Sequence, residues 1–194
     1  MPAPSSRVRT VVLVEGPSDA AVLHALAESE GRSLGSERTA VIAMGGVTNI
    51  GPYLRRYRSA TDRLSVAGLC DAGEERFVRR ALQAEGLSAQ TRQEMAQLGF
   101  YVCDADLEDE MLRALGLQAA EAVLQGEGEL ELFRRFQWQP AQRQRSVHDQ
   151  LHRFAGTRSG RKVRLAGSMA SSLPHADTPA PLRGLLDFIR PDHA

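Results

Sequence analysis

The chain is poor in the residues and patterns that mark secreted or membrane-spanning proteins. It has two cysteines in 194 residues, Cys70 and Cys103, and they do not form a CxxC pair. We therefore expect two buried free thiols, and neither a disulfide framework nor a structural zinc site. No apolar run approaches the roughly 20 residues that span a bilayer, and Glu15 and Asp19 interrupt the N-terminal run before the length of a signal peptide. The expected location is the cytoplasm, without membrane contact.

The chain also has no net charge and a single lysine. Lys162 is the only lysine among 24 basic residues, which balance 24 acidic residues. This balance argues against indiscriminate electrostatic binding to nucleic acid. It conceals an asymmetry, because residues 104–131 hold nine acidic residues and one basic residue, whereas residues 134–164 hold nine basic residues and one acidic residue. Either an acidic pole binds cations while a basic surface meets phosphates, or the two segments pair with each other.

Four short apolar runs, each followed by a helical pattern, organise the first part of the chain. The runs are Val11–Val14, Ala40–Ala43, Leu64–Cys70 and Phe100–Cys103. Strands that alternate with helices are typical of a sheet built from right-handed βαβ units. We therefore predict an α/β fold with a mostly parallel four-stranded sheet flanked by helices. Beyond residue 116 the pattern is helical throughout, which predicts a helical C-terminal extension.

The same patterns predict how the chain divides. We expect residues 1–8 to form a disordered leader, residues 9–116 an α/β core, and residues 117–194 a helical extension. A chain of 194 residues is long enough for one domain with a sizeable core and a smaller appended part. The extension is expected to pack back on the core, because its apolar residues, Phe133 and Phe136 among them, need cover.

Acidic residues stand at the ends of three of the four expected strands. Glu15 follows the first strand, Asp71 follows the third, and the cluster Asp104–Glu110 follows the fourth. Taken alone, Glu15 is better explained as a solvated loop residue in a capped strand–turn–helix unit. However, ligands of open α/β sheets bind outside the carboxyl ends of the strands, so these residues are expected to converge although they lie far apart in sequence.

Carboxylates that converge without neutralising partners must share a cation, separate, or raise a pKa. Hard oxygen ligands of this kind suit Mg²⁺ or Mn²⁺. An ion held in this way polarises a phosphoryl oxygen and activates a nucleophile, and two ions roughly 4 Å apart stabilise both the attacking and the leaving oxygen. The pattern therefore indicates phosphoryl transfer or phosphodiester hydrolysis.

The motifs around these residues resemble a known family. The strand Val11–Val14 with its Glu-Gly end, followed by Asp71-Ala72-Gly73-Glu74, resembles the TOPRIM fold of topoisomerases, primases and several nucleases. Asp106-Leu107-Glu108-Asp109 and the segment 159–166, SGRKVRLA, resemble the TOPRIM half of OLD-family (overcoming lysogenisation defect) nucleases. The resemblance covers roughly residues 9–190, with the motifs in the expected order, and implies a Rossmann-like TOPRIM core.

The resemblance implies a metal-dependent nuclease of the two-metal type. By their match to the family motifs, the residues expected to hold metal are Glu15, Asp19, Asp71, Asp106 and Glu108. Glu15 would serve as a metal ligand or as a general acid–base, and Lys162 would stabilise the charge that develops on the scissile phosphate. Two observations support this set independently: Lys162 is the only lysine, and the i, i+4 spacing of Glu15 and Asp19 lets both face one ion.

The sequence departs from the family pattern at Gly73. This residue stands where the second aspartate of a DxD motif is expected, so that only Asp71 is acidic. The missing ligand would be supplied by Glu74, by Ser65 or by a backbone carbonyl, or one metal position is weakened. The departure puts two-metal catalysis in doubt more than the fold.

OLD-family enzymes usually carry an ABC-type ATPase on the same chain. The sequence has no G-x-x-x-x-G-K-[ST] motif, so we expect a stand-alone TOPRIM protein in which any ATP gating comes from a separate ABC-type ATPase. The basic residues near the C-terminal motif are expected to bind the nucleic-acid backbone; they are Arg158, Arg161, Lys162 and Arg164. His148 and His152, four residues apart, are interpreted as a solvated helix face, because the glutamate of an H-E-x-x-H motif is missing.

Three functions remain as hypotheses. The first is a Mg²⁺- or Mn²⁺-dependent endonuclease that acts on DNA. The second is a structured-RNA maturase, similar to the small ribonuclease of the M5 type that shares the fold. The third, suggested by Gly73, is a catalytically weak TOPRIM module that partners a separate ATPase.

Overall fold

The computed structural model describes residues 8–59, 64–158 and 160–191. Of the expected leader, residues 1–7 lie outside this part of the chain, as does Ser159 of the C-terminal motif. Val8 is partly buried and packs against the core.

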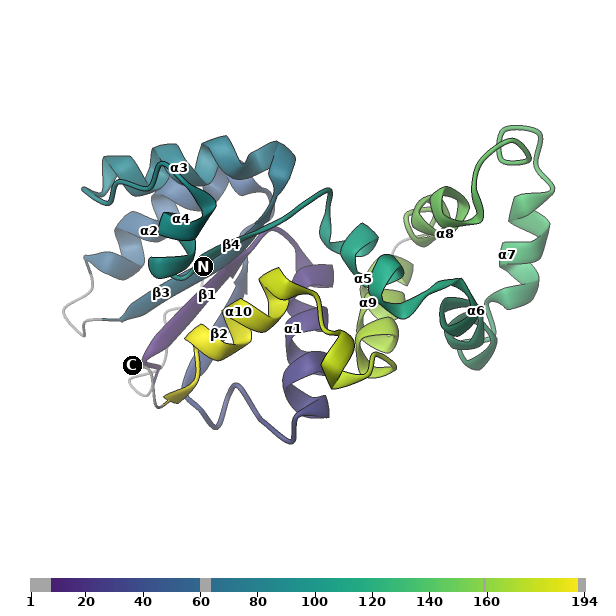
Figure 1. The fold of residues 1–194 in the computed structure, drawn as a ribbon, viewed down its shortest axis with the longest axis horizontal. Helices are drawn as coiled ribbons and strands as arrows, with labels where there is room; N and C mark the ends of the chain where they lie inside the picture. The colour runs from purple at the N-terminus through teal and green to yellow at the C-terminus, as the bar shows by residue number, and fades with distance from the viewer. Residues whose placement is uncertain (1–7, 60–63, 159, 192–194) are drawn as a thin grey trace.

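A four-stranded sheet forms the centre of the described chain (Figure 1). Its strands are β1 (Thr10–Val14), β2 (Thr39–Ala43), β3 (Ser65–Asp71) and β4 (Phe100–Cys103). The strand order is β2-β1-β3-β4, and every neighbouring pair is parallel. The central strand β1 is fully buried, as its continuous apolar run predicts for a strand covered on both faces. The predicted α/β fold with a parallel four-stranded sheet is thereby confirmed.

Helices make up most of the rest of the described chain. They are α1 (Pro17–Ser29), α2 (Ile50–Arg58), α3 (Glu75–Ala84), α4 (Arg92–Gln97), α5 (Leu107–Leu115), α6 (Leu117–Gly126), α7 (Leu130–Gln137), α8 (Val147–Ala155), α9 (Arg161–Ser171) and α10 (Ala180–Phe188), with short 3₁₀ turns η1 (Val47–Asn49), η2 (Ala72–Glu74) and η3 (His175–Asp177). The first core lies between the sheet and α1, α9 and α10. The second lies on the opposite face, under α2, α3 and α4. This sandwich holds the carboxyl ends of the strands at one rim.

A third core lies away from the sheet, in a part of the chain that we call the helical arm, residues 117–158. Helices α6, α7 and α8 project from one end of the α/β layer in Figure 1. Phe154 of α8 packs against Phe133 and Phe136 of α7, with ring centroids 5.3 and 5.5 Å apart. Leu112 of α5 and Leu165 of α9 join the same cluster and tie the arm to the α/β layer.

The helices of the C-terminal part of the chain belong to two different cores. Helices α9 and α10 share a core with the sheet, whereas α6–α8 have a core of their own. The division of the chain at residue 116 into two domains stays a prediction. The helical C-terminal part itself is confirmed.

Two further expectations concern thiols and membranes. Cys70 and Cys103 are both buried and free, as predicted, and burial raises the pKa of the Cys70 thiol to about 12. Among the described helices, none combines the length and the apolar character that crossing a membrane requires.

Candidate metal centre

The first carboxylates of the site lie at the turn between β1 and α1. Glu15 directly follows β1, and Gly16 starts α1 with Pro17 in its first turn. The Gly16 N–H donates to Asp19 Oδ2 at 2.9 Å, and the Ser18 hydroxyl donates to Asp19 Oδ1 at 3.1 Å. Asp19 therefore fixes the helix start, while its carboxylate lines the same cleft as Glu15.

Asp71 and Glu74 bring two more carboxylates to Glu15. Asp71 is the last residue of β3, and the 3₁₀ turn η2 that follows carries Glu74 back towards the strand end. Ligand oxygens of Glu15, Asp71 and Glu74 all lie within 4.8 Å of one another. We call this group the strand-end cluster. In this cluster Glu74 provides the second carboxylate that Gly73 does not provide. The alternative that Ser65 fills the gap is wrong, because Ser65 pairs with Thr10 at the opposite end of β3.

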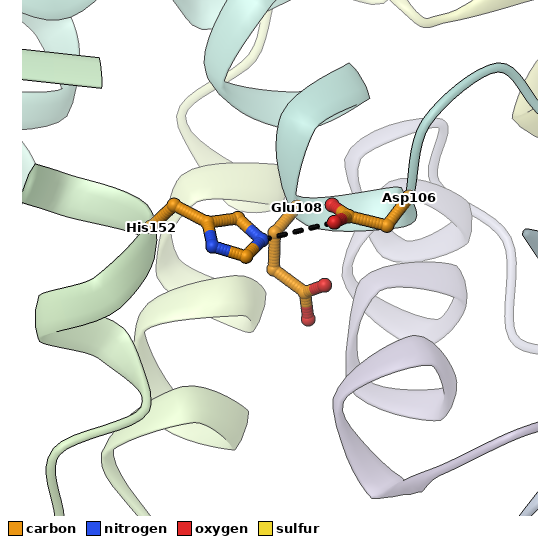
Figure 2. A group of neighbouring side chains, drawn as sticks. All are labelled: Asp106, Glu108 and His152. Atoms are coloured by element: carbon orange, nitrogen blue, oxygen red, sulfur yellow. Dashed lines mark hydrogen bonds and ion pairs between the residues drawn. The ribbon is translucent and has the colours of Figure 1, made fainter. Parts of the chain in front are cut away.

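A second group of possible ligands lies at the start of α5 (Figure 2). Asp106 caps this helix by accepting the Asp109 N–H at 2.8 Å, and Glu108 lies in the first turn. His152 approaches from α8, with Nε2 3.0 Å from Asp106 Oδ2. The three residues offer ligand atoms within 4.8 Å of one another. We call Asp106, Glu108 and His152 the arm-side cluster.

One cleft joins the two clusters. It has a volume of about 290 Å³ and is lined by Glu15, Asp19, Asp71, Glu108 and Lys162, among other residues. Lys162 reaches into it from the first turn of α9, where its Nζ lies 2.9 Å from Glu108 Oε1. The structure thus brings the expected residues Glu15, Asp19, Asp71, Glu108 and Lys162 together, and Asp106 borders the same site.

Gly45 and Gly46 form the opposite wall of the cleft. Their backbone N–H groups donate to the Glu15 carbonyl at 2.9 and 3.2 Å, and both residues have positive φ angles, 72° and 122°. A side chain at either position would be strained, so glycine is required for this turn. The turn fixes the backbone of Glu15 at the strand end.

The strand-end cluster is electrostatically unfavourable without a cation. Burial, together with the negative charges of Asp106, Asp19 and Glu108, raises the pKa of Asp71 to about 7. Burial and the neighbouring Glu15 raise the pKa of Glu74 to about 7. One oxygen of Glu74, Oε2, is buried without a hydrogen-bond partner in the described chain. Three carboxylates with an unpartnered buried oxygen fit a hard divalent ion such as Mg²⁺ or Mn²⁺.

The carboxylates of the arm-side cluster, in contrast, have nitrogen-bearing side chains of the same chain as partners. The hydrogen bond from His152 lowers the pKa of Asp106, and the same bond raises the pKa of His152. Burial lowers the pKa of Lys162, but its hydrogen bond and ion pair with Glu108 outweigh burial, so the net shift is upward. Asp106 has the imidazole of His152 at 3.0 Å, and Glu108 has the ammonium group of Lys162 at 2.9 Å.

The basic residues expected to bind nucleic acid separate into two groups. Arg161 is only 4% exposed; its Nη2 lies 3.0 Å from Glu129 Oε2, and its guanidinium covers the Phe154 ring. The prediction that Arg161 binds nucleic acid is corrected, because the guanidinium is buried in an ion pair within the chain. Arg164 also pairs with Glu129, at 2.5 Å, but its side chain is half exposed. Arg158 is exposed and makes no ion pair within the described residues.

The charge asymmetry of the sequence is therefore resolved in part by pairing between the two segments. Glu127 and Glu129 from the acidic stretch bind Arg161 and Arg164 from the basic stretch. Lys162 likewise pairs with Glu108.

Sequence reasoning assigned the wrong environment to the two histidines of α8. His148 lies 3.3 Å from Asp109, and His152 lies 3.0 Å from Asp106, so both face the first turns of α5 rather than solvent alone. Their i, i+4 spacing was the available signal. The two histidines have no neighbouring glutamate in the sequence. In the fold their acidic partners come from the start of another helix, α5.

The first part of the chain matches a known family of domains. Residues 8–71, which include Glu15, Asp19 and Asp71, match the family described as "Overcoming lysogenization defect protein-like, TOPRIM domain". Over these residues the chain is similar to an OLD-like TOPRIM domain. A comparison with curated proteins gives no match.

Solved structures extend the likeness to nearly the whole chain. The C-terminal region of the Burkholderia pseudomallei OLD protein superposes with a TM-score of 0.72 at 21% identity, covering 96% of this chain and 99% of that one. The C-terminal region of the Xanthomonas campestris pv. campestris OLD protein, phased with platinum, gives a TM-score of 0.72 at 25% identity, covering 95% and 93%. The mercury-phased structure gives 0.71 at 23%, covering 97% and 98%. The chain has the fold of the C-terminal region of OLD proteins.

Proposed function

We propose that this protein is a metal-dependent nuclease that hydrolyses phosphodiester bonds of DNA. The observation that carries the proposal is the meeting of Glu15, Asp71, Glu108 and Lys162 in one cleft, although they come from four separate parts of the chain. A cleft with several carboxylates and one ammonium group suits a phosphodiester, which needs cations on its oxygens during hydrolysis. The likeness to OLD proteins supports the same class of reaction.

The carboxylates would hold Mg²⁺ or Mn²⁺. The strand-end cluster fits one ion, and Asp106 with Glu108 would bind a second ion on the other side of the cleft. Asp19 lies between them and would contribute its charge to both, as its raised pKa, caused by burial and by Glu108, indicates. When bound, such ions polarise the phosphoryl oxygen and lower the pKa of an attacking water molecule.

Lys162 has the position of a group that contacts the scissile phosphate. Half of its side chain is exposed, so the ammonium group can reach a phosphate oxygen while it stays near Glu108. Its pKa is raised, so it stays charged at neutral pH. A charged donor beside the cleft would stabilise the negative charge that builds up on the phosphoryl oxygens.

A basic groove beside the arm-side cluster offers a path for the nucleic-acid backbone. It has a volume of about 690 Å³, and its lining includes Arg145, His152 and Arg153. Both arginines are exposed and make no ion pair within the described residues. Exposed guanidinium groups next to a cleft are suited to hold phosphates. The proposed path runs from the cleft along α8, with Arg158 near its end.

The structure weakens the case for a catalytically weak module. That hypothesis rested on Gly73, and Glu74 now supplies a carboxylate at the same cluster. Cleavage of structured RNA remains the alternative, because the cleft residues act on phosphates that DNA and RNA share. A partner ABC-type ATPase stays a prediction.

The test is incubation of the purified protein with supercoiled plasmid or with folded ribosomal RNA precursor. Each substrate is incubated with Mg²⁺ or Mn²⁺ and, as a control, with EDTA. We expect nicking of plasmid in Mg²⁺ or Mn²⁺, and its loss in EDTA and in the Asp71→Ala, Glu108→Ala double variant. Nicking by the double variant equal to that of the wild type would refute the proposal, and cleavage confined to RNA would redirect it.

A further inference from the structure

His152 stands where the arm-side cluster would otherwise have only two carboxylates. We propose that His152 Nε2 is itself a ligand of the second cation, together with Asp106 and Glu108, and that this position prefers first-row transition ions over Mg²⁺. The inference deepens the proposed function, and rests on it for the presence of a cation at this end of the cleft. It identifies the class of ion and the donor set.

The spacing of the donor atoms suits one ion. Two donors bound at about 2.1 Å and at right angles to one another lie about 3.0 Å apart, and His152 Nε2 lies 3.0 Å from Asp106 Oδ2. A donor oxygen of Glu108 lies within 4.8 Å of both. Figure 2 shows the imidazole and the Asp106 carboxylate facing each other across the first turn of α5, with Glu108 beside them.

Asp106 and His152 are held in place by contacts other than the one between their proposed ligand atoms, which an ion would replace. Asp106 uses Oδ1 to accept the Asp109 N–H, so Oδ2 is the oxygen that faces the histidine. The neighbours of His152 on α8, Leu151 and Phe154, are buried in the core of the helical arm and fix the helix against α5. The imidazole is therefore placed by packing.

The donor set separates the two cation positions by chemistry. Glu15, Asp71 and Glu74 offer oxygens alone, which suit Mg²⁺ and Mn²⁺ equally well. The arm-side cluster adds a nitrogen, and imidazole suits transition ions rather than Mg²⁺, which keeps to oxygen ligands. A ligating imidazole must be neutral, so His152 would bind an ion through an unprotonated Nε2.

Pulsed electron paramagnetic resonance of bound Mn²⁺ tests the inference directly. The sample is the full chain in the Asp71→Asn background, which weakens the strand-end cluster, loaded with one equivalent of Mn²⁺. We expect the ¹⁴N modulation of a coordinated imidazole, its loss in a further His152→Gln change, and its retention in a further His148→Gln change. Nitrogen modulation that is absent from the parent, or that persists after His152→Gln, would overturn the proposal.

Calorimetric titration gives the second readout. His152→Gln is expected to lower Mn²⁺ affinity at the arm-side cluster by tenfold or more, and Mg²⁺ affinity by much less. An equal loss for the two ions would contradict ligation by nitrogen. Thermal unfolding in EDTA checks that His152→Gln folds as the parent does. If nitrogen ligation is present but plasmid stays uncut, the inference stands and the proposed nuclease function fails. If plasmid is nicked but nitrogen ligation is absent, the proposed function stands and the inference fails.

Discussion

Glu74 lies beside Asp71 at the end of β3, because a single 3₁₀ turn folds the chain back between them. The two carboxylates have pKa values raised to about 7, chiefly by burial. A pair of acids held in this way needs a cation at neutral pH. The relationship places a carboxylate one residue beyond the position at which the family pattern would have it.

Glu74→Gln is therefore expected to weaken metal binding. The amide keeps the shape of the side chain but removes its charge, so Mn²⁺ affinity at the strand-end cluster should fall at least tenfold, as measured by calorimetry. Glu75→Gln is the matched control. Glu75 is engaged by Arg79 and Arg92 at 2.5 and 2.9 Å, so its loss should leave metal affinity unchanged. Equal affinities for the Glu74 variant and the wild type would remove Glu74 from the site.

The stability of the metal-free protein is expected to fall as the pH rises from about 4 to about 7. Asp71 has an ordinary pKa of 3.8 when unfolded and about 7 when folded, so in this window the folded protein binds a proton that the unfolded chain does not. Asp71→Asn removes the contribution of Asp71 to this dependence, while that of Glu74 remains. In EDTA at pH 8 the variant should be more stable by about 1–2 kcal/mol, after allowance for partial exposure.

Thermal unfolding in EDTA at pH 5 and pH 8 measures the effect. The two proteins should differ less at pH 5 than at pH 8, where the difference in Tm should be about 4 °C. Mn²⁺ should then raise the Tm of the wild type and have much less effect on the variant. A variant that is less stable than the wild type at pH 8 would show that Asp71 is not strained in the metal-free cleft.

Lys162→Ala is expected to lower the nicking rate 10²–10³-fold, which is typical of removing a charged donor from a transition state. Metal affinity should not fall, because the change frees Glu108 from its ion pair. Lys162→Arg should restore little of the rate, since a planar guanidinium does not replace a compact ammonium group. Single-turnover kinetics at saturating Mn²⁺ provide the measurement. Full activity in the alanine variant would exclude a role at the phosphate.

Arg161→Met is expected to destabilise the fold rather than to impair nucleic-acid binding. The change leaves Glu129 as a buried charge with one partner fewer, and breaking such a pair typically costs about 3–5 kcal/mol. A second change, Glu129→Leu, should recover much of the loss. Arg158→Ala, an exposed change, should instead leave the Tm unaltered and weaken DNA binding modestly. Chemical unfolding and a fluorescence binding assay separate these outcomes, and an unchanged stability of Arg161→Met would contradict the buried pair.

Much of the fold could be predicted because its signals are local. The strand runs are continuous and apolar, and three of the four end at an acidic residue, so that Glu15 and Asp71 were expected at one edge of the sheet. Helices α9 and α10 were harder to place, because their apolar faces pack on a sheet formed far earlier in the chain. Nothing in their own sequence distinguishes a helix on the sheet from one in the arm.

The rest of the candidate site depends on contacts between distant residues. His152 meets Asp106 across 46 residues, and Arg161 meets Glu129 across 32 residues. Both partners were visible in the sequence as members of charged segments, but pairing between two such segments is set by the packing of α8 and α9. The sequence leaves Glu74 and Ser65 as alternative replacement ligands. The direction of β3 decides between them, because Ser65 lies at the far end of this strand.

The most direct measurement is the anomalous scattering of crystals grown with Mn²⁺. The account predicts two peaks in the cleft, one bounded by Glu15, Asp71 and Glu74 and the other by Asp106, Glu108 and His152. Crystals that contain Mn²⁺ at saturating concentration but show no anomalous peak at either cluster would contradict it.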